Sequence, residues 1–398
     1  MRIKMKNKFF SGISFNVLLL GIVSFLTDAS SEMIAPILPM LITSLGGTGI
    51  IIGLVGGLRD SISSMMNVIS GYWSDRSGKR KKFVVLGYSS SAFFKLFLSL
   101  SKSWAQILAF VSMERVGKGL RNAPRDAIIS ESMPQNLGKA FGFHRTMDSA
   151  GAILGSVLVL LFLWLFGLSF NMIILIAAII AFLSLIPLYF VEEKKVSANK
   201  ELPRLSFKEL PKQLKMFLIV AGIFSFANFS YMFFILKAQE QFGKDAVILP
   251  ILLYILFNIF YTTFSIPFGI LSDRIGRKKV ILMGYMLFAF TSIGFAVFGS
   301  LASFTILFAS YGVSYAIIDG NQRAFVSELS SKSLKAMGLG AYHTIIGLIA
   351  LPAGLIAGAL WESFSPAVTF IYGSIMSFFA IALFFAFKNY FIGANKKV

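Results

Sequence analysis

Long apolar stretches alternate with short polar ones along almost the whole chain. A helix needs roughly 20 apolar residues to cross the hydrocarbon core of a membrane. Pro36 and Pro39 interrupt the first such stretch without ending it. The pattern predicts an all-α membrane protein with twelve transmembrane helices, at 13–43, 49–71, 83–101, 104–131, 138–166, 169–191, 214–238, 245–271, 280–299, 302–328, 336–362 and 365–388.

A polar loop occurs twice in the chain. Residues 71–82 read Gly-Tyr-Trp-Ser-Asp-Arg-Ser-Gly-Lys-Arg-Lys-Lys, and residues 269–279 read Gly-Ile-Leu-Ser-Asp-Arg-Ile-Gly-Arg-Lys-Lys. The matching residues Asp75 and Asp273 are 198 positions apart, about half of the 398-residue chain. A half-chain repeat in a very apolar protein predicts a duplicated bundle of membrane helices. We therefore expect two pseudo-symmetric six-helix bundles, at 1–191 and 214–398, joined by a cytoplasmic linker at 192–213.

The composition supports a membrane protein and argues against several other classes. Hydrophobic residues make up 56% of the chain and charged residues 14%, whereas a soluble domain carries about 25% charged residues. The chain has no cysteine and only two histidines, so we expect no disulfide, no metal site and no cofactor. It also lacks the glycine-rich phosphate loop and the serine elbow of common enzymes, which argues against an enzyme.

The net charge of +19 reflects topology rather than a nucleic-acid partner. Most of the excess Lys and Arg lies in short loops on one side of the predicted spans, and both termini belong to that side. Cytoplasmic loops of membrane proteins carry such an excess. We expect a multi-pass protein of the plasma membrane, surrounded by lipid and monomeric, with both termini in the cytoplasm.

Charged residues interrupt the predicted spans of the first half. A charge at the middle of a bilayer costs about 2.5–3.5 kcal/mol on insertion scales, so such residues are expected to face a cavity or a partner. Asp28 and Glu32 are four residues apart in the first span and share one helix face. The fourth span carries a polar stripe made of Glu114, Lys118, Arg121 and Arg125. These residues predict a polar interior in the first bundle.

The repeated loop resembles the signature loop of the major facilitator superfamily, which occurs between the second and third spans and again between the eighth and ninth. The resemblance implies a secondary transporter whose two bundles expose a central site alternately to each side. It also implies a cytoplasmic gate that holds the outward-open state. The expected gate residues are Asp75, Arg76, Gly78, Arg80, Arg125, Asp126, Glu131, Arg145, Asp148, Asp273, Arg274, Gly276, Arg277, Arg323 and Glu328.

Two structural alternatives to this gate remain open. The basic residues of the loops could serve only to set the topology of the chain. Arg125, Asp126, Arg145 and Asp148 could form a fixed network of salt bridges that holds helices together.

The segment Arg115-x-x-x-Gly119-x-x-x-Ala123 resembles a fourth-span motif of proton-coupled carriers in the same superfamily. There the arginine is linked to proton movement, and acids in the first span resemble the arrangement in proton-driven multidrug antiporters. A carboxylate beside a buried arginine can take up a proton when the pair separates. The expected proton-coupling residues are Asp28, Glu32, Asp60 and Arg115. Ser156 stands where the antiporter motif has a proline, which leaves the direction of transport open.

The second half is richer in aromatic residues than in charges. An aromatic wall with few polar groups suits a lipophilic or aromatic ligand or a cation, although packing against lipid would explain at least half of these rings. The expected residues of the central cavity are Arg59, Lys118, Arg121, Asn228, Tyr231, Lys237, Tyr254, Asn258 and Asp319.

Three functions fit these features. The first is proton-coupled export of small lipophilic molecules, and the second is a proton-coupled carrier of an organic anion, with Lys118, Arg121, Arg145 and Lys237 as anion ligands. The third is a membrane receptor that transports nothing. The near balance of acids and bases in the polar seam of the fourth span favours the first function, because an anion carrier is expected to have bases without acidic partners.

Overall fold

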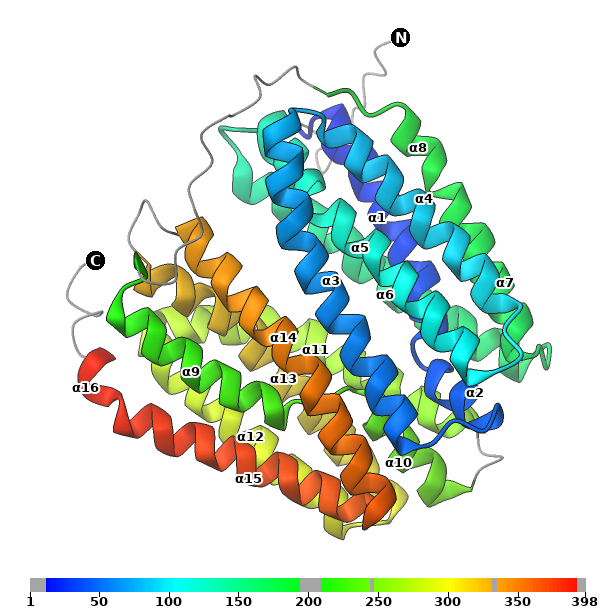
Figure 1. Cartoon of the computed structure of the whole chain (residues 1–398), viewed down its shortest axis with the longest axis vertical. Coiled ribbons are helices and arrows are strands. Elements are labelled where there is room, and N and C mark those ends of the chain that lie inside the picture. The colour runs from blue at the N-terminus through cyan, green and yellow to red at the C-terminus, as the bar shows by residue number, and fades with distance from the viewer. Residues whose placement is uncertain (1–11, 194–208, 244–246, 331–334, 392–398) are drawn as a thin grey trace. The chain divides into compact units, whose positions relative to one another are not determined.

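The computed structural model describes residues 12–193, 209–243, 247–330 and 335–391, and its long elements are α-helices (Figure 1). This agrees with the predicted all-α class. In chain order the helices are α1 (Phe15–Ile34), α2 (Leu38–Ser44), α3 (Gly49–Ser77), α4 (Arg80–Ser99), α5 (Trp104–Ser132), α6 (Leu137–Trp164), α7 (Phe170–Leu183), α8 (Leu185–Tyr189), α9 (Lys212–Ala227), α10 (Met232–Phe242), α11 (Ile248–Ile275), α12 (Arg277–Val297), α13 (Leu301–Leu329), α14 (Lys335–Ser363), α15 (Pro366–Ala386) and α16 (Lys388–Phe391).

Ten helical segments within the described ranges are long and apolar enough to cross a membrane. Three of these segments consist of two helices each, namely α1 with α2, α7 with α8, and α9 with α10. The helices α4 and α5 are 20 and 29 residues long and carry charged side chains inside their length. With these two helices the fold contains the twelve spans that the sequence predicts.

The first span breaks where the sequence predicts a break. Helix α1 ends before Pro36, and Pro39 lies in the first turn of α2. Proline has no amide hydrogen and disfavours helical geometry in the residue before it, so two prolines three residues apart interrupt the helix.

The break between α9 and α10, at residues 228–231, was not predicted. It contains no proline, but Asn228 and Ser230 carry short polar side chains that compete for backbone hydrogen bonds. The Ser230 hydroxyl accepts a hydrogen bond from the amide of Met232 at 3.4 Å. The break places Tyr231 between two helices instead of within one.

The chain divides into two compact units. Unit 1 takes in residues 1–34, 66–100 and 113–202, and unit 2 takes in residues 35–65, 101–112 and 203–398. The units do not follow the predicted halves, because α2 and the first part of α3 pack with the second unit. Most of the predicted linker, residues 194–208, lies outside the described residues.

In unit 1, α1 packs against α6 and α7, and α4 packs against α7 (Figure 1). The contact between α1 and α6 is close because Gly155 has no side chain. A Cβ atom at this position would lie 2.2 Å from the carbonyl oxygen of Ala29. An apolar core that includes Val17, Leu20 and Ile129 fills one end of the unit.

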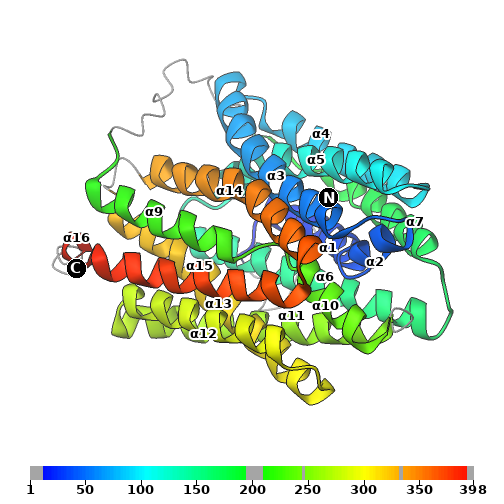
Figure 2. The ribbon, with the colours of Figure 1, turned by 60° about the horizontal axis from the view of Figure 1, so that its bottom comes forward.

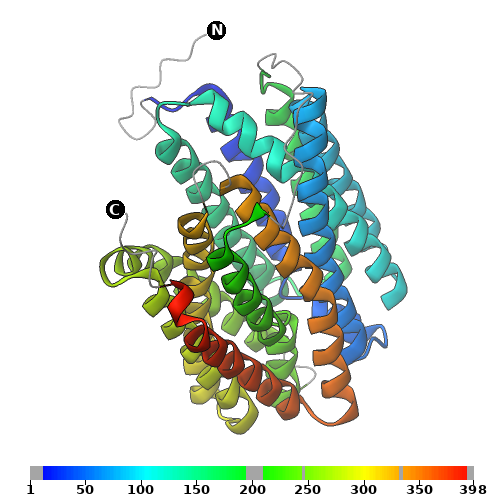
Figure 3. The same cartoon turned by 60° about the vertical axis from the view of Figure 1, so that its left-hand side comes forward.

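In unit 2, α12 packs against α13 and α15, and α9 packs against α14 and α15. Figure 2 shows α9, α15 and α12 side by side, and Figure 3 shows α14 beside α9. Stacked rings join α10 to α13 and α9 to α12. The ring centroids of Phe234 and Tyr311 are 4.0 Å apart, and those of Phe224 and Tyr285 are 3.9 Å apart.

Candidate functional site

A group of charged side chains lies inside unit 1, on α4 and α5. Lys95, Glu114, Arg115 and Arg121 are each less than 10% exposed, and we call them the buried charge layer. The Nε atom of Arg115 lies 2.9 Å from the Glu114 carboxylate. Burying a charge is costly unless an opposite charge or hydrogen bonds compensate it. The partners of each member therefore decide what the layer can do.

Lys95 is not among the predicted site residues. Its Nζ atom donates hydrogen bonds to the hydroxyl oxygens of Ser30 at 2.8 Å and Ser31 at 2.9 Å, both on α1. The Ser30 hydroxyl in turn donates to the carbonyl oxygen of Ala177 on α7 at 2.6 Å. One buried ammonium group thus joins three helices of unit 1.

Arg121, which we predicted to line the cavity, is held against α4. Its guanidinium group donates to the Ser91 hydroxyl at 3.0 Å and lies over the ring of Tyr88, 4.2 Å from its centroid. Ser91 also donates to the backbone carbonyl of Glu114 at 3.2 Å. A cation over a ring face adds to the stability of such a contact.

Asp28 of α1 lies among charged residues of α5 and α6. Asp28 and Glu32 are both half-buried, as is Lys118. The Asp28 carboxylate interacts electrostatically with Asp148, Lys118 and Arg121. Unit 1 therefore brings Asp28 together with cations of the predicted polar stripe.

Two further pairs belong to unit 1. The Arg125 guanidinium lies 2.8 Å from the Asp126 carboxylate, and His144 Nδ1 lies 3.4 Å from Asp148. Arg145 is exposed. These contacts are compatible with the predicted gate and also with the fixed network that is its structural alternative.

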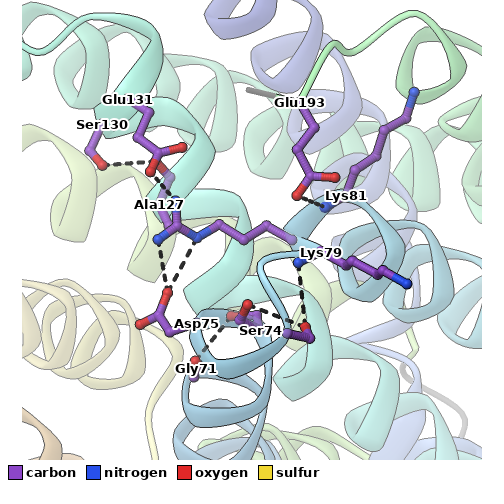
Figure 4. A network of polar contacts seen from close by, with 11 residues as sticks. Gly71, Ser74, Asp75, Lys79, Lys81, Ala127, Ser130, Glu131 and Glu193 are labelled. Atoms are coloured by element: carbon purple, nitrogen blue, oxygen red, sulfur yellow. Dashed lines mark hydrogen bonds and ion pairs between the residues drawn. The ribbon is translucent and has the colours of Figure 1, made fainter. Parts of the chain in front are cut away.

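The first copy of the repeated loop lies between α3 and α4. Gly78 has a φ of 64°, a conformation that favours glycine and allows the tight turn. Arg80 donates to Asp75 at 2.9 Å and forms an ion pair with Glu131 at the end of α5 (Figure 4). Burial lowers the pKa of Arg80, but its hydrogen bonds to Glu131 and Asp75 outweigh that effect and raise it. The loop, α3 and α5 are thus joined by a guanidinium that stays charged.

The second copy, between α11 and α12, repeats this arrangement in unit 2. Gly276 has a φ of 96°. Arg277 pairs with Asp273 at 3.1 Å and with Glu328 at 2.6 Å. In both copies the arginine and its glutamate are 51 residues apart. The predicted gate residues Arg76 and Arg274 are exposed.

Unit 2 contains a continuous set of aromatic side chains, of which Tyr254, Phe257 and Tyr311 are buried, and we call it the aromatic cluster. Arg59 lies at one end, with its guanidinium 5.3 Å from the ring centroid of Tyr231 and a hydrogen bond to the Tyr231 hydroxyl. The members are Tyr231, Tyr254, Phe257, Tyr261, Tyr311 and Tyr315.

Asp319 lies at the other end of the aromatic cluster. It accepts a hydrogen bond from the Tyr261 hydroxyl at 3.0 Å and forms an ion pair with Arg323. The predicted cavity residues Asn228, Lys237 and Asn258 are half-buried. The predicted proton-coupling residue Asp60 belongs to unit 2, whereas Asp28, Glu32 and Arg115 belong to unit 1.

The first part of α3 touches α14 through glycines, and we call this contact the glycine seam. A Cβ atom on Gly53 would lie 2.0 Å from the carbonyl oxygen of Gly354, and one on Gly358 would lie 2.4 Å from that of Gly49. Glycines allow helices in membranes to approach this closely. Since α3 and α14 come from opposite halves of the sequence, the seam joins the halves within unit 2.

No group of three or more His, Asp or Glu side chains is arranged to hold a metal ion in the part of the chain that the structure describes. The charged groups of the site have instead serine, tyrosine and carboxylate partners.

The sequence matches the family model of the Major Facilitator Superfamily over residues 20–259 and 251–391. The chain belongs to the major facilitator superfamily. The protein is therefore a multi-pass membrane transporter and not an enzyme. The family predicted from the two loop copies is confirmed.

Known relatives agree with this assignment. An uncharacterized MFS-type transporter of Methanocaldococcus jannaschii is 59% identical over 92% of this chain and 93% of its own length. The multidrug transporter MdfA of Edwardsiella ictaluri is 34% identical over 98 residues, 25% of this chain and 24% of its own. The crystal structure of the nucleoside transporter NupG has the same fold, with a TM-score of 0.77 and 17% identity over 95% of this chain and 99% of its own.

Proposed function

We propose that the protein uses the proton gradient across the plasma membrane to export small lipophilic molecules. The observation that carries this proposal is the position of Asp28 among the charged groups of α5 and α6 inside unit 1. A carboxylate in such a place exchanges protons with water when its cationic neighbours move away. Asp28 and Glu32 would then be the proton carriers and Arg115 would modulate them.

The partial likeness to a multidrug transporter supports a lipophilic substrate. The half-buried rings of the aromatic cluster, Tyr231, Tyr261 and Tyr315, support the same substrate class, since aromatic side chains commonly line sites for small apolar ligands. The glycine seam would close one side of the transporter and separate when that side opens. Both termini would lie in the cytoplasm.

The second candidate is a proton-coupled carrier of an organic anion, and the buried cations of unit 1 favour it. Three of these cations already have partners, however. Lys95 binds two serines, Arg115 pairs with Glu114, and Arg121 binds Ser91. An anion would have to displace these contacts, so export of a lipophilic molecule agrees better with the geometry.

Proton flux tests the proposal directly. The purified protein in liposomes containing a pH-sensitive dye is offered neutral, cationic and anionic lipophilic compounds. We expect at least one compound to drive proton movement. Asp28→Asn and Glu32→Gln should abolish this flux because each removes a group that binds the proton.

Glu209 is exposed and lies outside the spans, so Glu209→Gln is a control for the loss of one negative charge. It should leave the flux unchanged. If Asp28→Asn and Glu32→Gln both keep the proton coupling of the native protein, the assignment of the proton carriers is wrong.

A further inference from the structure

We infer that Trp361 and Glu362, near the end of α14, form a latch that holds the glycine seam closed on the side away from the repeated loops. The inference rests on the proposed function, in which the seam separates when that side opens, and it names the contacts that must break for this opening. Both are positioning residues, because they act on the neighbouring helices and not on the transported molecule.

Along its middle, the seam consists of backbone packed against backbone. A Cβ atom on Gly354 would lie 2.2 Å from the carbonyl oxygen of Gly53, and one on Gly57 would lie 2.7 Å from that of Ala350. Amide and carbonyl groups inside a helix bond to each other within that helix. Van der Waals contact therefore holds this stretch, and side chains at its ends can decide whether it stays closed.

Trp361 lies at the end of the seam where α3 begins, and it is only 7% exposed. A Cβ atom on Gly49 would lie 3.1 Å from the indole Cδ1 atom, so the ring packs directly on the first residue of α3. The ring centroid lies 5.4 Å from that of Phe233 on α10 and 6.1 Å from that of Phe370 on α15. The indole Nε1–H group donates to the Glu240 carboxylate on α10 at 3.2 Å. One side chain of α14 thus joins three other helices.

Glu362 adds an electrostatic contact to the same end of α3. Its carboxylate accepts a hydrogen bond from the amide of Ile50, the second residue of α3, at 3.4 Å. The first amides of a helix have no partner within it, and the helix dipole favours a negative charge there. This contact is longer than most hydrogen bonds, so its electrostatic part is the larger one. It exists only while α3 and α14 are together.

The position of the latch allows it to open. Glu240 and Glu362 are both exposed, so water can replace the bonds that their carboxylates make. Helix α3 begins at the latch and reaches the first loop copy at its other end. In the proposed topology the latch lies on the outer side of the membrane, where an exporter releases its cargo.

Labelling of one introduced cysteine tests the latch without a substrate or a proton gradient. A Cβ atom on Gly56 of α3 would lie 2.6 Å from the side chain of Ser230, so Ser230→Cys is the reporter of seam opening. In this background we expect Trp361→Ala to raise maleimide labelling in membranes about 5-fold or more. Trp361→Phe keeps a ring but loses the bond to Glu240, and it should raise labelling less.

The two exposed acids supply variants that leave the buried ring in place. Glu240→Ala and Glu362→Ala should each raise labelling about 2- to 5-fold, because each removes one contact of the latch. Glu209→Ala is the matched control for the acids. Phe364→Ala is the control for the ring, since Phe364 follows α14 and is 72% exposed. Neither control should change the labelling.

A second reporter separates a released latch from a loosened fold. Ser292 on α12 is fully buried and lies outside the seam. Labelling of Ser292→Cys should stay at the native level in every latch variant. Unchanged labelling of Ser230→Cys in both Trp361→Ala and Glu240→Ala, or an equal rise at the two reporters, would overturn the inference.

Failure of the latch can be told from failure of the proposed function. If Gly53→Leu raises the labelling of Ser230→Cys but the latch variants do not, the seam separates as proposed and the latch is wrong. If the latch variants behave as expected but no compound drives proton flux, the latch stands and proton-coupled export is wrong.

Discussion

At the scale of single residues, hydroxyl groups hold much of the charge inside unit 1. Ser30 and Ser31 accept hydrogen bonds from Lys95, and Ser91 accepts one from Arg121. A hydroxyl can both accept from a cation and donate to a carbonyl oxygen, as Ser30 does toward Ala177. Serine therefore lets a charged group on one helix bind the backbone of another.

Replacing Lys95 should destabilise the protein. In Lys95→Met the two serine hydroxyls lose their cationic donor and Glu114 loses a nearby positive charge. We expect a loss of about 1–3 kcal/mol in the free energy of unfolding. Thermal unfolding in detergent, compared with the exposed control Lys102→Met, measures the difference. Equal melting of the two variants would contradict the role that we assign to Lys95.

The sequence identifies some of these residues and not others. The polar stripe of α5 is visible because four charged residues follow the helical period within one apolar span. Lys95 is a single charge in its span, and its partners lie 64 and 65 residues earlier in the chain. A contact that depends on how two distant helices pack cannot be inferred from spacing along one of them.

At the scale of elements, the two loop copies have the same contacts but different exposure. The Arg80 side chain is 13% exposed and that of Arg277 is 29% exposed. Their positions are 197 residues apart, whereas the aspartates that align the two loops are 198 apart. When Asp75 is aligned with Asp273, Arg277 therefore matches Lys79. In the structure, however, Arg277 pairs with Asp273 and Glu328, as Arg80 pairs with Asp75 and Glu131.

The ion pair with the more buried arginine should be the stronger one. In double-mutant cycles, we expect Arg80→Ala with Glu131→Ala to give a coupling energy of about 1–3 kcal/mol. Arg277→Ala with Glu328→Ala should give about 0.2–1 kcal/mol, because water screens the more exposed guanidinium of Arg277. Thermal unfolding of the single and double variants measures both values. A larger coupling for the second pair would show that exposure does not control these contacts.

Breaks in helices are predictable only in part. The break between α1 and α2 follows from Pro36 and Pro39, whose backbone geometry acts locally. The break between α9 and α10 lacks such a signal and coincides with the contact between Tyr231 and Arg59. This contact joins residues 172 positions apart in the sequence, so the spacing of residues near the break does not reveal it.

At the scale of the whole molecule, the sequence is repeated but its chemistry is not. The buried charge layer lies in the first half, and the aromatic cluster lies in the second half. This difference supports a division of labour between proton binding and ligand binding. Twelve spans and two loops suffice to identify the fold, whereas the residue ranges of the two compact units do not follow from the repeat.

Enlarging a glycine of the seam should keep α3 and α14 apart. The chain has no cysteine, so one introduced cysteine reports accessibility without background. Ser230→Cys lies beside Gly56 of α3. We expect Gly53→Leu to increase maleimide labelling of this cysteine several-fold in membranes.

In the control Gly340→Leu nothing lies within 4 Å of the added Cβ, and labelling should not change. Unchanged labelling in Gly53→Leu would show that the seam does not gate access.

Between Gly53 and Gly358 the two helices meet backbone to backbone. Their amide and carbonyl groups already bond within each helix, so separating this stretch breaks few polar contacts and mainly opens a narrow slot. A thin, rigid, apolar compound could enter that slot and prevent the helices from meeting again. Such a wedge would arrest the transport cycle without competing with the transported molecule.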